Sequence, residues 1–138
     1  MTRTFATVAL LATLATPLTA QTTRPAKDAG DTSSNGRPVK ELIADLTAAA
    51  PATRNGAAYQ LGFMGPAARA AVPALIIALS DESALVRYPA AYALGEIGPD
   101  AESAVPALQK LTEDPQDDVA FIARKALKKL GHPVPATE

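Results

Sequence analysis

The sequence has no cysteine, no tryptophan and a single histidine, His132. Without cysteine the chain can form neither a disulfide nor a thiolate-based catalytic or metal site. One histidine, near the end of the sequence, cannot supply the positioned base of a serine–histidine triad. Glycine-rich phosphate loops and the H-E-x-x-H zinc motif are also missing. We therefore expect a protein that is not an enzyme and that needs no cofactor and no metal.

The sequence also lacks an excess of charge of either sign. Its 13 basic and 14 acidic side chains give a net charge of −1, so no overall field favours nucleic acid or an anionic membrane. Aromatic residues make up only 4% of a chain that is 48% hydrophobic. This composition predicts a core of small aliphatic side chains, which suits closely packed helices.

The N-terminal residues differ from the rest. Arg3 precedes an apolar stretch from Phe5 to Ala15, and the small residue Ala20 ends the segment. This pattern predicts a signal peptide over residues 1–20 and an exported protein, periplasmic or secreted. The alternative is a retained membrane anchor, but the apolar stretch is about half as long as a spanning helix requires. Polar residues 21–36 predict a flexible linker, and Pro-rich residues 132–138 a disordered tail.

Between these segments the apolar positions recur every 33 residues. The repeated sets are Val39, Val72 and Val105; Leu42, Leu75 and Leu108; Leu61, Leu94 and Leu127; and Gly65, Gly98 and Gly131. A fixed period of this length is typical of stacked helical repeats. It predicts an all-α fold, an α-α superhelix of three helix pairs, over residues 37–131. The repeats span about 38–70, 71–103 and 104–131.

Each repeat reads as two helices. In the second repeat the apolar spacing i, i+3, i+4 and i+7 predicts a first helix from Val72, with Pro73 in its first turn. Ser83 is the predicted N-cap of the second helix, and Gly98 followed by Pro99 is its predicted end. Pro89 conflicts with this pattern because a proline near the second turn predicts a kink or a later helix start.

The second repeat resembles a HEAT repeat of the phycobilisome-lyase-like type, which is common in bacteria. The matching stretches are Ala71 to Leu75, the loop residue Asp81, the pair Val86 and Arg87, and Ala93 to Pro99. The outer repeats depart from this pattern at Lys40, Ala48, Ala120 and Lys128, as end repeats of a solenoid often do. The resemblance implies that second helices line a concave, protein-binding side. It also implies a bilin-lyase activity for a subset of the family.

Aromatic residues define the candidate binding face. At about 100° per residue, Tyr88, Tyr92 and Gly95 point away from the predicted core of their helix. Comparing the three repeats gives a candidate partner-binding set of Tyr59, Phe63, Tyr88, Tyr92, Phe121 and Lys125, with Lys128 and Lys129 beside it as a basic flank. Tyrosine and phenylalanine are common interface anchors. The alternative is that Tyr59 and Tyr92 pack in the seam between neighbouring second helices, while the lysines offset the helix dipole.

These features predict a non-catalytic scaffold or adaptor that binds a protein or peptide outside the cytoplasm. Nucleic acid is not an expected partner, and neither is a membrane unless the signal segment is retained. One alternative is a bilin-lyase-like or other ligand-carrying module, which a deep pocket with converging polar groups would favour. Another is a structural spacer of a larger assembly, which an exposed apolar flank would favour.

Overall fold

The computed structural model describes residues 32–33, 35–134 and 136. The predicted signal peptide and most of the predicted linker lie outside these residues. The described chain forms six α-helices and two 3-10 helices, which follow one another as α1 (Val39–Asp45), α2 (Pro51–Met64), η4 (Gly65–Ala71), α3 (Val72–Ala78), α4 (Ala84–Ile97), η5 (Gly98–Ala104), α5 (Val105–Leu111) and α6 (Asp117–Lys129). The all-α fold of three helix pairs predicted from the 33-residue period is therefore confirmed.

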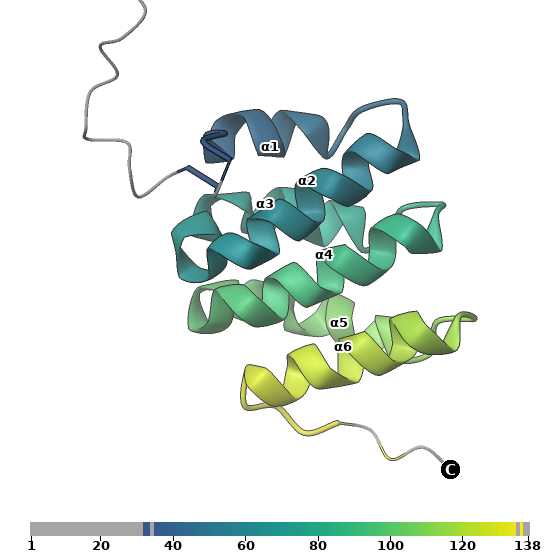
Figure 1. The fold of residues 1–138 in the computed structure, drawn as a ribbon. Coiled ribbons are helices and arrows are strands. Elements are labelled where there is room, and N and C mark those ends of the chain that lie inside the picture. Colours follow the sequence, from purple (N-terminus) through teal and green to yellow (C-terminus); the bar gives the residue numbers. More distant parts are fainter. Residues whose placement is uncertain (1–31, 34, 135, 137–138) are drawn as a thin grey trace, which may run out of the picture.

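The helix pairs stack into two layers. The second helices α2, α4 and α6 lie side by side in one layer, and the first helices pack behind them (Figure 1). The core lies between the layers. The leucines that recur with the repeat are fully buried there, namely Leu42, Leu75 and Leu108 from the first helices and Leu61, Leu94 and Leu127 from the second helices. The sequence period thus marks the residues that each repeat contributes to the shared core.

A 3-10 helix joins each of the first two repeats to the next, which the repeat pattern alone does not predict. Gly65 and Gly98 end α2 and α4 with φ values of 58° and 82°, where glycine is favoured because it has no Cβ. The proline after each glycine begins the 3-10 turn instead of ending helical structure. Alanines spaced by three residues then face the core, as 3-10 geometry requires. These buried alanines are Ala68 and Ala71 in η4, and Ala101 and Ala104 in η5.

Helix α4 passes through Pro89 without interruption. It begins at Ala84 with Ser83 as its N-cap, whose hydroxyl accepts a hydrogen bond from the Leu85 amide at 3.3 Å, so the expectation of a later start is wrong. Pro89 has no N–H, and the carbonyl four residues before it belongs to Leu85. That carbonyl accepts a hydrogen bond from the side-chain amide of Asn55 on α2. The neighbouring repeat therefore supplies the donor that proline removes from the helix.

Both ends of the described region are attached to the helical core. Ser33 is buried, and its amide donates to the Arg37 carbonyl at 2.8 Å, in a stretch that the sequence assigns to the linker up to residue 36. At the other end, Gly131 has φ of 81°, and the His132 amide donates to the Leu127 carbonyl at 3.0 Å. This is a Schellman cap. Val134, in the predicted tail, packs against the core.

The helical run from Pro51 to Ala78 contains an 18-residue window with a mean hydropathy of 1.5, which suits a membrane span by length and composition alone. It is not one straight helix, because it comprises α2, η4 and α3 and changes direction at Gly65. Its leucines Leu61 and Leu75 are fully buried within the repeats. We therefore assign these buried leucines to the solenoid core.

Candidate partner-binding face

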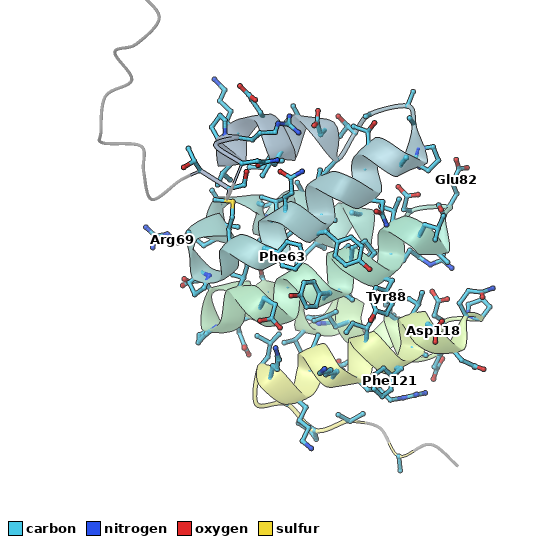
Figure 2. All side chains as sticks on the ribbon, viewed as in Figure 1. Phe63, Arg69, Glu82, Tyr88, Asp118 and Phe121 are labelled. Carbon is cyan, nitrogen blue, oxygen red and sulfur yellow. The ribbon has the colours of Figure 1, made fainter. Side chains whose placement is uncertain are left out.

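The outward surface of α2, α4 and α6, here called the second-helix face, is hollowed by a groove of about 570 Å³. Each of the three helices contributes to it. In Figure 2, Tyr88 of α4 and Asp118 of α6 lie on this face, with Phe121 one turn further along α6. The lining residues are Asn55, Tyr59, Ala84, Leu85, Tyr88, Gln116, Asp118, Val119 and Phe121.

Four aromatic rings form a cluster beside and within the groove. The Tyr59 ring centroid lies 6.2 Å from that of Phe63, 6.5 Å from that of Tyr88 and 6.0 Å from that of Tyr92. The Phe63 and Tyr92 rings meet edge to face at 6.1 Å. Such pairs contribute about 0.5–1.5 kcal/mol beyond the area they bury. Burial, followed by the neighbouring Tyr88 and Tyr92, raises the pKa of Tyr59 above its ordinary value.

The predicted binding residues are only partly brought together. Tyr59, Tyr88 and Phe121 line the groove, whereas Phe63 lies at its side in the ring cluster and is 70% exposed. Phe121 is 61% exposed. Lys125 lies elsewhere, beside Tyr92, Glu96 and Lys129 in a separate shallow hollow between α4 and α6. In that hollow Lys129 pairs with Glu96.

Tyr92, Gly62 and Gly95 lie in the seam between second helices. A Cβ added to Gly62 would be 2.7 Å from Cε1 of Tyr92, and one added to Gly95 would be 3.1 Å from Cα of Ala126. Gly95 is buried, so the prediction that it points outward is wrong. Both glycines let neighbouring helices approach closely. Tyr92 therefore packs in the seam, which is the alternative that the sequence also allowed for it.

Sequence reasoning did not assign five of the lining residues to the groove. They are Ala84, Leu85, Gln116, Asp118 and Val119. Leu85 and Asp118 precede Tyr88 and Phe121 by three residues, a spacing that places side chains on the same helix face. This three-residue spacing is the sequence feature that could have placed Leu85 and Asp118 in the groove. Leu85 is 69% exposed, so one of the larger apolar side chains of the groove is open to solvent.

Arginine–aspartate pairs connect successive repeats on the loop side of the second helices. Arg54 binds Asp81 through two hydrogen bonds, Nε to Oδ2 at 2.7 Å and Nη2 to Oδ1 at 2.9 Å. Arg87 binds Asp114 in the same way, at 2.8 and 3.1 Å. This two-point geometry makes strong, directional ion pairs. Their side chains are at most 15% exposed. We call these two pairs the inter-repeat ladder.

Each residue of the ladder also binds the backbone of an inter-helix loop. Nη1 of Arg87 donates to the Asp81 and Glu82 carbonyls at 2.8 and 3.1 Å, and Arg54 does the same for the loop of its own repeat. Oδ1 of Asp114 accepts from the Gln116 amide at 2.9 Å, next to the start of α6. The ladder therefore fixes the loops that precede the second helices and, with them, one end of the groove.

The end repeats depart from the repeat pattern at the positions where a ladder residue would lack a neighbouring repeat to pair with. Ala48 occupies the position of the ladder aspartate in the first repeat, and Ala120 that of the ladder arginine in the third. Arg124, one turn after Ala120, donates instead to the Thr112 carbonyl at 2.9 Å. A further repeat stacked on either end could not form the same ion pair with these alanines.

Because of the ladder, the stability of the fold depends on pH in the acid range. The hydrogen bond from Arg54 is the main cause that lowers the pKa of Asp81, while burial opposes it. For Asp114 burial is the largest single influence and raises the pKa, but the hydrogen bonds from Arg87 and the Gln116 amide, with the Arg87 charge, outweigh it and lower the pKa overall.

Carboxylates with lowered folded pKa values add stability that is present above their unfolded pKa of about 3.9 and is lost as pH falls through the folded values. We expect the urea midpoint to fall steeply between about pH 4 and pH 2. In an Asp114→Asn variant, which has one fewer such carboxylate, the fall should be shallower. Parallel pH profiles for the two proteins would show that Asp114 does not contribute.

Three stacked helix pairs with buried, repeat-spaced leucines and an inter-repeat ladder define an α-solenoid. A sequence model of HEAT repeats matches residues 39–133, from the first residue of α1 to beyond α6. The chain therefore belongs to the HEAT repeat family. HEAT repeats are commonly protein-interaction scaffolds and are generally not enzymes. No curated protein matches the chain.

Proposed function

We propose that this protein is a non-catalytic HEAT-repeat scaffold that binds another protein or peptide through the concave face of its second helices, outside the cytoplasm. One observation carries the proposal. Three of the large apolar side chains that stay exposed belong to α2, α4 and α6, namely Phe63 at 70%, Leu85 at 69% and Phe121 at 61%. Two of these line the groove. Exposed apolar residues grouped in this way are typical of interaction sites.

The groove suits a peptide or protein segment because it is open and runs across three helices. Rigid aromatic anchors are available at Tyr59, Tyr88 and Phe121, and polar side chains such as Asn55 and Gln116 lie beside them. This is the composition of an interface hot spot, with aromatic side chains in the middle and polar groups that orient the partner. An enclosed pocket with converging polar groups, which a ligand-carrying module of the bilin-lyase type would favour, is a different arrangement.

The finer family assignment and the compartment are also part of the proposal. The match of residues 71–75 and 93–99 to the repeat pattern supports the phycobilisome-lyase-like subgroup. The basic residue, apolar stretch and small residue within positions 1–20 support export. We expect the protein recovered from periplasm or medium to begin at about Gln21 when its N-terminus is sequenced. Recovery from the membrane fraction with Met1 present would contradict cleavage.

The binding proposal is tested with two exposed groove residues. We expect the double variant Leu85→Ala and Phe121→Ala to keep the melting temperature within a few degrees, because exposed substitutions change stability by about 0.5 kcal/mol each. Partners captured by the tagged parent protein from periplasm or medium should be lost. The matched control is Ile77→Ala, which removes a 74% exposed apolar side chain from α3 on the other layer. Unchanged capture by the double variant, or equal loss with the control, would overturn the proposal.

A further inference from the structure

The groove brings aromatic rings from all three repeats to one place. Tyr59 comes from α2, Tyr88 from α4 and Phe121 from α6, and the exposed Leu85 lies among them. Each aromatic ring presents a partly negative face, which attracts a cation placed over it. The same rings can hold the aliphatic stem of a long basic side chain. The groove thus has the shape and surface to accept a side chain that is apolar along its length and positive at its end.

The charge of the groove has one sign. Asp118 is its charged lining residue, and no lysine, arginine or histidine of the described chain lines it. The ladder guanidinium groups of Arg54 and Arg87 are already bound to Asp81 and Asp114. The lysines of α6 line the separate hollow between α4 and α6 instead. An acidic or neutral occupant would therefore leave Asp118 without a counter-charge inside the groove.

From this arrangement we infer that the groove binds an arginine side chain of the partner segment, with the guanidinium against Asp118 and its stem on Tyr59, Tyr88 and Phe121. The inference rests on the proposed function and names the chemistry that the same site recognises. Arginine fits better than lysine because its planar group stacks on rings while donating several hydrogen bonds. Acceptors are available from the Asp118 carboxylate, the Gln116 side chain and the tyrosine hydroxyls.

Asp118 also lies in the first turn of α6, where any carboxylate stabilises the helix dipole. Asp117 lies in the same turn but does not line the groove. Substitutions of these two aspartates therefore distinguish a helix-dipole role from a binding role. If Asp118 acts only through the helix dipole, Asp117→Asn and Asp118→Asn should change binding of an arginine peptide equally. If Asp118 contacts the cation, only Asp118→Asn should weaken that binding.

The test uses the ¹⁵N-labelled full chain and the blocked tripeptides acetyl-Ala-Arg-Ala-amide and acetyl-Ala-Gln-Ala-amide. We expect the arginine peptide to shift amide signals of residues 84–88 and 116–121, with binding at least about five-fold tighter than that of the glutamine peptide. Asp118→Asn and Phe121→Ala should weaken the arginine peptide by a similar factor, and Asp117→Asn should leave it unchanged. Added salt should weaken binding.

Equal binding of the two peptides, equal effects of the two asparagine variants, or shifts confined to other residues would overturn the inference. So would concentration-dependent dimerisation that Phe121→Ala abolishes, because a second copy would then occupy the groove. The partner-capture experiment gives a separate outcome for the proposed function. If capture needs Leu85 and Phe121 but arginine is not preferred, the scaffold function stands and the arginine inference fails.

Discussion

Replacing Arg87 with alanine is expected to lower the free energy of unfolding by about 3 kcal/mol, because removing one partner leaves the other charge buried and unpaired. That charge is Asp114, whose side chain is only 5% exposed. The carbonyls of Asp81 and Glu82 lose their donor in the same variant. Urea unfolding followed by circular dichroism measures the change.

Arg69→Ala is the matched control for this variant. Arg69 lies on η4, is exposed, and has no ion pair among the described residues. Its replacement should change stability by no more than about 0.5 kcal/mol. A double-mutant cycle of Arg87→Ala with Asp114→Ala should give a coupling energy of about 1–3 kcal/mol. A cost for Arg87→Ala as small as that for Arg69→Ala would contradict a stabilising ladder.

Two glycine-to-alanine substitutions in α2 are expected to have opposite effects. At Gly56 an added Cβ meets nothing within 4 Å, so Gly56→Ala should stabilise the protein by about 0.5–1 kcal/mol through helix propensity. At Gly62 the added Cβ lies 2.7 Å from Cε1 of Tyr92 and 3.2 Å from Cα of Ala93. Gly62→Ala should therefore destabilise the protein by about 1–2 kcal/mol, since overpacking exceeds the gain in propensity.

Thermal and urea unfolding of the two variants side by side measure this difference. Because Tyr92 contacts Tyr59 and Phe63, Gly62→Ala should also change the near-ultraviolet circular dichroism of the tyrosines, while Gly56→Ala should leave it unchanged. Two variants that both gain stability would show that α2 and α4 do not approach as closely as described.

The repeat period predicted the fold because each repeat buries the same residues. Leu61, Leu94 and Leu127 lie in equivalent fully buried positions, so the spacing in the sequence becomes a spacing in the core. The 3-10 helices escaped prediction because a Gly-Pro pair signals the end of an α-helix but does not specify the conformation of the residues after it. Pro89 looked disruptive because its compensation is supplied from a different repeat, by Asn55.

The binding face could be predicted in part, for a similar reason. A helical wheel separates the core side of a helix from the rest, and it correctly placed Tyr59, Tyr88 and Phe121 outside the core. It cannot separate the open face from the seam with a neighbouring helix, which is where Tyr92 and Gly95 lie. That distinction depends on how closely α2, α4 and α6 approach one another.

We propose that a partner docks in the groove of the second-helix face. Site-specific photocrosslinking tests it most directly, with a benzoylphenylalanine residue placed either at Phe121 in the groove or at Ile77 on the other layer. Both native side chains are apolar and exposed, at 61% and 74%. We predict that irradiation of periplasm or medium containing the tagged chain gives a discrete adduct from position 121 and none from position 77. An adduct from position 77 alone would place the partner on the first helices and contradict docking in the groove.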